Sequence, residues 1–194
     1  MDQTQAEKLF RDCGAYLQGH FLLTSGLHSS GYLQCALVCQ RPDVCAQFGE
    51  HLAASFRDGP VDVVIGPAMG GIVLAYELAR ALGARGVFTE RGDDGRMALR
   101  RGFEIRAGER VVVAEDVMTT GGSAAEIVEM AEKAGAKVVG VAALVDRGGA
   151  ARFAGRTVAA ALKVDLPTWK PEECPLCRQG LPAVKPGSRK QPGK

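Results

Sequence analysis

The stretch VVVAEDVMTTGGSAAEIVEMAEKAG, Val111 to Gly135, decides the fold class of this chain. Four apolar residues lead into two carboxylates, a run of threonines and glycines follows, and the second half repeats apolar residues at helical spacing. This order predicts a buried strand, a turn and a helix that ends at Gly135. Such a strand-turn-helix unit is typical of a parallel sheet covered by helices.

The same alternation extends to both sides of this unit. Further buried strands are predicted at 61–65, 86–89 and 137–146, and helices at 42–56 and 71–83. Near-continuous apolar strands separated by helices indicate an α/β protein with a mostly parallel sheet. Ligands of such sheets bind at the carboxyl ends of the strands. Four polar or glycine-rich loops follow those ends: GPAMGG (66–71), ERGDDGR (90–96), EDVMTTGGS (115–123) and DRGG (146–149).

The amino-terminal part has a different pattern. Thr4 and Glu7 have the spacing of a capping box, which predicts a first helix with an apolar face that reaches Tyr16 and Leu17. The segment 20–38, HFLLTSGLHSSGYLQCALV, places two β-rich runs around a Ser/Gly segment. We expect a hairpin-like pair of strands with a polar tip there.

Composition limits the function classes. The chain has 194 residues, of which 46% are hydrophobic, and a net charge of +2. One ordinary domain fits this length, and the small charge does not suggest nucleic acid as a partner. The sequence contains no apolar run of the ~18 residues that a membrane helix needs, and its start lacks a secretory signal. We therefore expect a cytoplasmic protein that does not bind membranes, with its six cysteines reduced.

The residues after the central strand suggest a phosphate site beside a sugar site. Backbone N–H groups of Thr119 to Ser123 and the start of the following helix can surround a phosphate. The alternative is an ordinary helix start capped by Ser123, but this does not explain the carboxylates of Glu115 and Asp116. Ribose 5-phosphate explains both features, because its hydroxyls donate to carboxylates while its phosphate occupies the loop. Carboxylates would also stabilise positive charge that develops on the sugar ring.

The segment VVVAEDVMTTGGS resembles the phosphoribosyl-pyrophosphate-binding motif of the type I phosphoribosyltransferases. The resemblance implies their fold, a mostly parallel five-stranded core sheet flanked by helices, with a small hood from the N- and C-terminal segments. It implies catalytic roles for Glu115 and Asp116. By matching, the donor-binding residues are Glu115, Asp116, Val117, Met118, Thr119, Thr120, Gly121, Gly122 and Ser123.

Two further segments resemble the orotate phosphoribosyltransferases. FLLTSGLHSSGYLQ (21–34) is similar to their amino-terminal signature, although His28 stands where many members have lysine. LVDRGG resembles their Asp-Arg strand end, so Arg147 is expected to fork onto the orotate carboxylate. The resemblance also implies orotate contacts for Ser25, Gly26 and Thr119. Taken singly, these residues would be better explained as turn formers and a surface arginine; their coincidence with the donor motif favours the orotate site.

The pyrophosphate side departs most from the family pattern. GPAMGG resembles the pyrophosphate loop, which in the family tends to hold a cis peptide; by matching, that bond joins Ala68 and Met69. Gly70 replaces a lysine that is frequent in the family. The following loop, 90–104, is shorter than in many relatives and lacks lysine and histidine. Arg91 and Arg100 are the candidates for pyrophosphate there, with solvated charges on a β-hairpin as the alternative.

The resemblance further implies a homodimer in which each active site is completed across the interface. Magnesium is expected to arrive with the donor rather than on a direct protein ligand. We expect one phosphoribosyltransferase domain over 1–185, with the hood from about 18–40 and 157–185, and a basic, disordered tail at 186–194.

Cys174 and Cys177 have the spacing of half a zinc knuckle, but no second Cys-x-x-Cys is present. The sequence favours a capped turn with two free thiols over a metal or redox site.

The activity implied is transfer of the 5-phosphoribosyl group from phosphoribosyl pyrophosphate to orotate in pyrimidine (UMP) biosynthesis. Three alternatives remain open: transfer to another base, a non-catalytic regulator that senses the ribosyl donor, and an enzyme fused to the next decarboxylase. The regulator should carry a DNA-binding appendage, and the fusion should carry a barrel; the sequence has room for neither.

Overall fold

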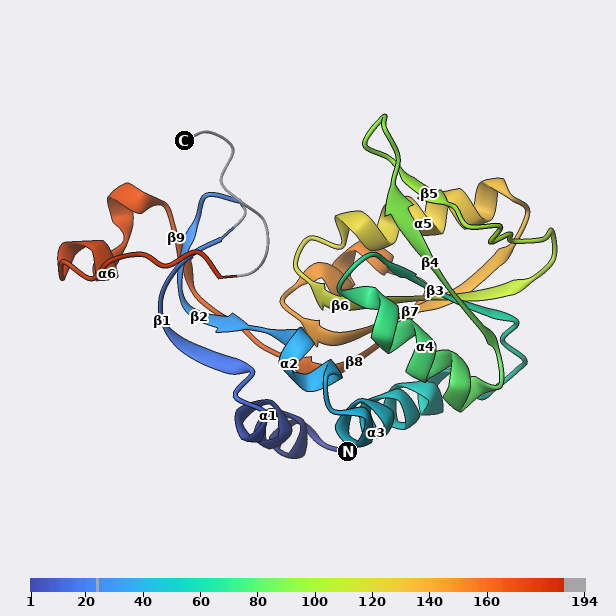
Figure 1. Ribbon diagram of the computed structural model, residues 1–194, viewed down its shortest axis with the longest axis horizontal. Helices are drawn as coiled ribbons and strands as arrows, with labels where there is room; N and C mark the ends of the chain where they lie inside the picture. Colours follow the sequence, from blue (N-terminus) through green and yellow to red (C-terminus); the bar gives the residue numbers. More distant parts are fainter. Residues whose placement is uncertain (24, 187–194) are drawn as a thin grey trace.

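The computed structural model describes residues 1–23 and 25–186. A six-stranded sheet with the order β5-β4-β3-β6-β7-β8 forms the larger body, called the core here (Figure 1). Five of its strands are parallel: β4 (Arg85–Arg91), β3 (Val63–Pro67), β6 (Arg110–Met118), β7 (Lys137–Asp146) and β8 (Thr157–Lys163). The predicted five-stranded parallel sheet is therefore confirmed, and β5 (Met97–Leu99) adds a short antiparallel strand beside β4.

Helices cover both faces of the sheet. On one face lie α1 (Gln3–Asp12), α3 (Pro42–Ala53) and α4 (Gly71–Leu82), and on the other lies α5 (Gly122–Lys133). Side chains of β6 alternate between these faces: Val112 and Ala114 join the cluster under α3 and α4, whereas Val111 and Val113 pack against α5. Burial on both faces explains the near-continuous apolar run of this strand.

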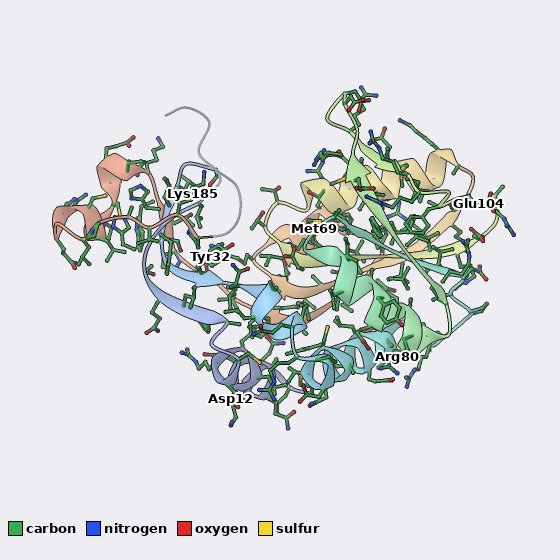
Figure 2. The ribbon with its side chains drawn as sticks, in the orientation of Figure 1. Asp12, Tyr32, Met69, Arg80, Glu104 and Lys185 are labelled. Carbon is green, nitrogen blue, oxygen red and sulfur yellow. The ribbon has the colours of Figure 1, made fainter. Side chains whose placement is uncertain are left out.

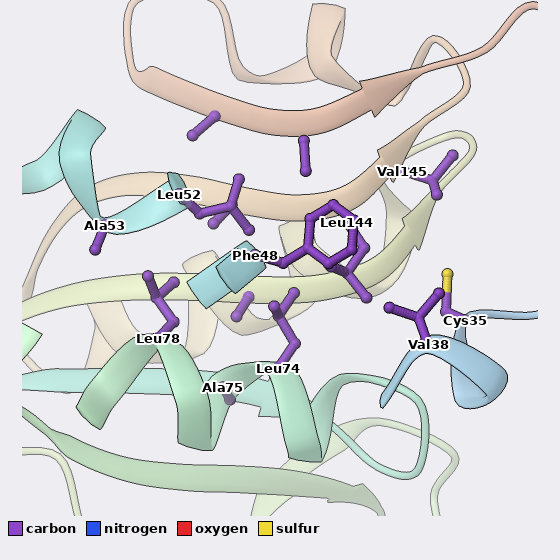
Figure 3. Packing of buried hydrophobic residues seen from close by; sticks show 14 of the residues in the cluster. Cys35, Val38, Phe48, Leu52, Ala53, Leu74, Ala75, Leu78, Leu144 and Val145 are labelled. Atoms are coloured by element: carbon purple, nitrogen blue, oxygen red, sulfur yellow. The ribbon is translucent and has the colours of Figure 1, made fainter. Parts of the chain in front are cut away.

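The larger cluster contains Phe48, Leu52, Leu74, Leu78 and Leu144, all with almost no exposed surface (Figure 3). Burying each such side chain contributes about 1.5–3 kcal/mol. This packing fixes α3 and α4 against β7 and holds the carboxyl ends of the strands in place.

The first helix begins earlier than the sequence suggested. Asp2 is its N-cap and exchanges two hydrogen bonds with Gln5, so the predicted capping box of Thr4 and Glu7 is wrong. The helix ends at Asp12, and Tyr16 opens β1 instead of continuing it. By contrast, the predicted helix stop at Gly83 is confirmed, because this glycine has φ 68° at the C-cap of α4.

A smaller antiparallel sheet, the hood, has the order β1-β2-β9. It contains β1 (Tyr16–Leu22), β2 (His28–Leu33) and β9 (Thr168–Trp169), followed by the turns η3 (Pro171–Glu173) and α6 (Pro175–Arg178) (Figure 1). The predicted hairpin is confirmed, except that its end forms the helix α2 (Cys35–Cys39). The carboxyl-terminal part of the hood begins later than 157, because residues 157–163 form β8 of the core sheet.

The short 3-10 helices η1 (Ala54–Phe56) and η2 (Gly149–Phe153) follow α3 and β7, respectively. Residues 187–194, which include nearly all of the predicted basic tail, lie outside the described residues. In the described ranges, every helix is too short or too polar to cross a bilayer.

Candidate active site

The carboxyl ends of the parallel strands bring three of the predicted loops together. Met118 at the end of β6 lies opposite Asp146 at the end of β7, and the Arg147 N–H donates to the Met118 carbonyl (2.8 Å). On the other side of β6, β3 leads into the GPAMGG loop. The sequence motifs that were separated by up to about 80 positions therefore share one edge of the sheet.

Glu115 and Asp116 lie within β6 itself, three and two residues before its end at Met118. Glu115 is buried, whereas Asp116 is partly exposed. The Asp116 N–H donates to Glu115 Oε1 (3.3 Å), and the Val117 N–H donates to Asp116 Oδ1 (2.8 Å). These two backbone hydrogen bonds orient both carboxyl groups at the position where the strand gives way to the loop.

Burial raises the pKa of Glu115 to about 9, and the neighbouring Asp116 carboxylate adds to the shift. The side chain is therefore protonated at neutral pH until a cation or a set of donors stabilises its charge. A pair of adjacent carboxylates that cannot easily ionise together is typical of a site that binds a positively charged or hydroxyl-rich group.

The raised pKa of Glu115 predicts a pH-dependent stability. Between the unfolded value near 4.5 and the folded value of about 9, the folded chain holds one more proton at this carboxyl. The free energy of unfolding should therefore fall as pH rises through this window, by at most about 1.4 kcal/mol per pH unit. Glu115→Gln should remove this contribution, so the variant should gain stability relative to wild type between pH 5 and 8.5.

Urea denaturation of both proteins across this range measures the difference. Because every other titrating group is shared, the difference between the two curves isolates Glu115. Parallel curves would show that this carboxyl ionises normally in the folded protein.

The loop after β6 and the start of α5 are the segment predicted to bind phosphate, called the cradle here. Thr119 and Thr120 are exposed, and Gly121 has φ 70° at the N-cap of α5. Among the described residues no side chain caps this helix, so the alternative in which Ser123 is the cap is wrong. The free N–H groups of the first turn therefore remain available to an anion.

Gly149, from η2, packs closely against the backbone of this cradle. A Cβ at Gly149 would lie 2.5 Å from Met118 Cγ and 3.0 Å from the Thr119 carbonyl oxygen. A Cβ at Gly121 would in turn meet the Phe153 ring at 2.9 Å. The backbone of the cradle is thus in close contact with the segment after β7. This supporting role of Gly149 and Phe153 was not predicted from the sequence. The DRGG motif contains Gly149 and could have indicated its role.

The GPAMGG loop lies directly against Asp116 of the acidic pair. The peptide bond between Ala68 and Met69 is cis, as the resemblance implied. A Cβ at Gly70 would lie 2.1 Å from Asp116 Oδ2, so this loop can approach the carboxylate only because position 70 has no side chain. Lysine, which the family often has here, would require a different loop or carboxylate position.

Arg147 begins the loop after β7 and is partly buried. Its Nη2 donates to the Leu166 carbonyl (3.4 Å), but its Nε is buried without a partner in the described part of the chain. Burial lowers the pKa of Arg147, while Asp165 and Tyr32 act in the opposite direction. A buried donor without an acceptor is costly, so this guanidinium is suited to an external anion.

Tyr32, at the end of β2, connects the hood with this site (Figure 2). Burial raises the pKa of Tyr32; the Asp116 carboxylate adds to this shift and Arg147 opposes it. The phenol therefore lies within the electrostatic reach of both groups. The amino-terminal signature contains this residue, but nothing in the sequence ranks it above the serines.

The other residues of the signature have separate positions. Ser25 and Gly26 are exposed at the hairpin tip, and no hydrogen bond between residues that the structure describes joins them to the β6 loop. Ser29 is fully buried, and its hydroxyl donates to the Pro167 carbonyl (3.1 Å). Ser29 therefore ties the hood strands together instead of facing a ligand.

The two loop arginines differ in their availability. Arg91 forms a bidentate ion pair with Glu126 of α5 (2.6 and 3.1 Å). Arg100 is exposed, and among the described residues its guanidinium has only a long contact of 3.9 Å to Asp93. Arg91 would have to leave Glu126 to reach a pyrophosphate, whereas Arg100 would not.

Comparisons with known proteins identify the family of this chain. A model of the family described as "Phosphoribosyl transferase domain" matches residues 42–165. The orotate phosphoribosyltransferase of Heliobacterium modesticaldum is 54% identical over 191 residues, which covers 97% of this chain and 100% of that protein. The orotate phosphoribosyltransferase of Pelotomaculum thermopropionicum is 53% identical over 190 residues, covering 98% and 100% of the two chains.

Solved structures agree with the sequence relatives. The crystal structure of orotate phosphoribosyltransferase from Aeropyrum pernix superposes with a TM-score of 0.64 at 29% identity, covering 81% of this chain and 92% of that one. The strand order, the acidic pair, the uncapped helix start and these relatives lead to one assignment. The chain belongs to the phosphoribosyltransferase family and, within it, to the orotate phosphoribosyltransferases.

Proposed function

We propose that this chain transfers the 5-phosphoribosyl group from phosphoribosyl pyrophosphate to a ring nitrogen of orotate, giving orotidine 5′-phosphate and pyrophosphate in pyrimidine biosynthesis. The observation that carries the proposal is the meeting of three unlike groups at one sheet edge: a carboxyl pair, a helix start that no described side chain caps, and an arginine whose buried Nε has no acceptor among the described residues. Each group matches one part of the two substrates.

The donor fits the β6 loop with its 5-phosphate and its ribose on two different groups. Its 5-phosphate would lie on the N–H groups of 119–123, where the helix dipole favours negative charge. Its ribose hydroxyls would donate to Glu115 and Asp116. As the bond between the anomeric carbon and pyrophosphate breaks, the electron pair leaves with pyrophosphate and positive charge develops on the ring, which these carboxylates stabilise.

The acceptor fits between the core and the hood. The guanidinium of Arg147 would hold the orotate carboxylate, and its unpartnered Nε supplies a donor for a bidentate contact. Tyr32 adds a polar group beside it. Thr119, Ser25 and Gly26 remain proposed orotate contacts. The orotate ring nitrogen then supplies the electron pair for the new bond and loses its proton.

Magnesium fits the chemistry of this edge. Carboxylate oxygens are ligands that Mg²⁺ prefers, and Asp116 lies beside the loop proposed for pyrophosphate. We propose that the ion arrives with the donor. When bound, it neutralises charge on the leaving pyrophosphate. Ala68, Met69, Gly70, Arg91 and Arg100 remain the candidates for contacts with that group.

A substrate-selectivity assay tests the proposed function. The protein is mixed with magnesium and phosphoribosyl pyrophosphate, then with orotate, uracil or adenine separately, and base consumption is followed. Consumption of orotate alone is expected. Consumption of adenine without orotate would contradict the proposal, and so would binding of the donor without turnover of any base, as expected for a regulator.

We further propose that the active form is a homodimer. Met69 and Tyr76 are 82% and 65% exposed, and Val73 lies between them on the same side of α4. Exposed apolar groups of this size commonly mark a protein interface. Met69 belongs to the loop beside Asp116, so a partner bound there would lie next to the active site, which supports completion of the site across the interface.

Tyr76→Glu is expected to convert the dimer to a monomer, because the interface would have to bury an unpaired charge. Tyr76→Phe keeps the apolar ring and should remain dimeric. Light scattering coupled to size-exclusion chromatography measures the masses. A wild-type monomer, or a dimer in both variants, would contradict the interface.

The domain organisation and the cellular location of the protein are proposed from its topology and its thiols. A single phosphoribosyltransferase domain over 1–185 is supported by the core and hood being joined through β2, α2 and the chain after β8. A cytoplasmic location is supported by six free thiols, all in the described ranges.

A further inference from the structure

Four metal-ligating side chains meet in the hood, away from the candidate active site. They are His20 of β1, His28 of β2, and Cys174 and Cys177 around the start of α6, called the hood cluster here. One potential ligand atom from each residue lies within 4.8 Å of all the others. The proposed function uses none of these atoms.

The hood cluster is largely shielded from solvent. His20 and His28 are 5% and 7% exposed and Cys174 is 0% exposed, whereas Cys177 lies at the surface. Two imidazoles and two thiols provide little hydrophobic stabilisation at a site where the hood is only three strands wide. Their convergence is better explained by a ligand that all four share.

The distances fit a tetrahedral centre. Cys177 Sγ lies 3.3 Å from His28 Nδ1 and 3.7 Å from His20 Nε2, and Cys174 Sγ lies 3.5 Å from His20 Nε2. Bonds of about 2.3 Å to sulfur and 2.0 Å to nitrogen imply edges of roughly 3.5 Å between sulfur and nitrogen in a tetrahedron. The two ring nitrogens are closer, 2.7 Å, and would separate by about 0.6 Å to reach the edge these bond lengths imply.

A second hydrogen bond fixes the orientation of His20. Its Nδ1 lies 2.7 Å from the Leu181 carbonyl oxygen, which can only accept, so Nδ1 carries the proton. The lone pair of Nε2 is then directed into the cluster. Metal-ligating histidines commonly have this arrangement, in which a carbonyl accepts from the other ring nitrogen.

We propose that the hood cluster is a structural zinc site with two histidine and two cysteine ligands. Two thiolates and two imidazoles in a tetrahedron favour zinc over magnesium or calcium, which prefer oxygen. Four protein ligands close the coordination sphere, which is typical of structural and not catalytic zinc. The site goes beyond the proposed function and does not depend on it.

The site would fasten the carboxyl-terminal segment to the hairpin. The Leu22 N–H donates to the Val184 carbonyl (2.9 Å), and the Val184 N–H donates to the His20 carbonyl (2.8 Å), so the chain after α6 already runs beside β1. Zinc would link this segment to both strands of the hairpin whose tip carries Ser25 and Gly26.

Metal analysis of the unmodified protein is the first test. The protein is purified under reducing conditions with zinc supplied, freed of loosely bound metal by gel filtration, and analysed by plasma mass spectrometry. About one zinc per chain is expected. Cobalt should replace it and produce visible absorption of a tetrahedral centre together with sulfur-to-cobalt charge transfer. Absence of retained zinc and of the charge-transfer band would overturn the proposal, and so would a disulfide between the two cysteines.

Variants assign the metal to these ligands. Cys177→Ser removes the most accessible ligand, so the fold around it has the best chance to persist, and zinc retention should drop to a small fraction of the wild-type content. Cys13→Ser removes a partly buried thiol outside the hood cluster and should retain the wild-type content. Equal zinc in the two variants would overturn the assignment. Because the cobalt spectrum is recorded on the wild type, the proposal can fail even if Cys177→Ser does not fold.

Discussion

Asp116→Asn is expected to lower kcat by about 100- to 1000-fold, equivalent to roughly 3–4 kcal/mol of lost transition-state stabilisation. The Asn side chain has the same shape, and its Oδ1 can still accept from the Val117 N–H, so the loop should keep its conformation. What the variant lacks is the negative charge beside the anomeric carbon. Steady-state kinetics with orotate and the donor measure the effect.

Asp62→Asn is the matched control for this change. Asp62, directly before β3, accepts from the Arg110 N–H (2.7 Å) at the opposite end of β6, so its replacement removes a carboxylate without touching the site. Thermal unfolding of both variants separates loss of charge from loss of fold. Wild-type turnover in Asp116→Asn would remove the carboxylate from the mechanism.

Arg147→Lys is expected to raise the KM for orotate by roughly 10- to 100-fold, because lysine keeps the charge but cannot form two parallel hydrogen bonds with a carboxylate. The KM for phosphoribosyl pyrophosphate should change little, since that substrate is proposed to contact β6 and α5. Initial rates with each substrate varied separately distinguish the two effects.

Arg152→Lys is the control, because Arg152 is exposed on the next turn, η2. It should leave both KM values unchanged. If Arg147→Lys instead raised the KM for the donor alone, Arg147 would belong to the phosphate side of the site and the proposed acceptor position would be wrong.

Much of the core could be predicted from sequence because its strands are buried on both faces. The run KVVGVAALVD predicted β7 with its observed bounds, since ten residues without a helical period fit only a strand between two helix layers. The acidic pair and the cradle were also predictable, because their residues are contiguous in a strand-loop-helix unit. Local patterns suffice where the site is built from one segment.

Contacts between distant segments were less accessible. The capping box at the first helix was misplaced because Asp2 and Thr4 offer similar side chains two residues apart, and only the hydrogen bond to Gln5 distinguishes them. The pairing of Arg91 with Glu126 joins segments 35 positions apart, and charge patterns alone do not specify such a partner. The unpartnered Nε of Arg147 is likewise a property of the packed structure.

The hood cluster is the clearest example. The Cys-x-x-Cys spacing alone does not indicate this cluster, because the other two candidate ligands are histidines more than 140 positions earlier in the chain. His28 was noted only as a departure from a family lysine. The same residue gives β2 a side chain that can ligate a metal. The proposed zinc site therefore explains why His28 stands in place of the family lysine.

We propose that one ligand contacts the loop after β6 with two different groups. Its phosphate lies on 119–123, and its sugar lies on the carboxylates of Glu115 and Asp116. Calorimetric titration of ribose 5-phosphate and of inorganic phosphate into the wild type and Asp116→Asn tests this most directly. The wild type should bind ribose 5-phosphate more tightly than phosphate, and the variant should lose most of that difference while its affinity for phosphate persists. An undiminished preference for ribose 5-phosphate in Asp116→Asn would show that the Asp116 carboxylate does not bind the sugar.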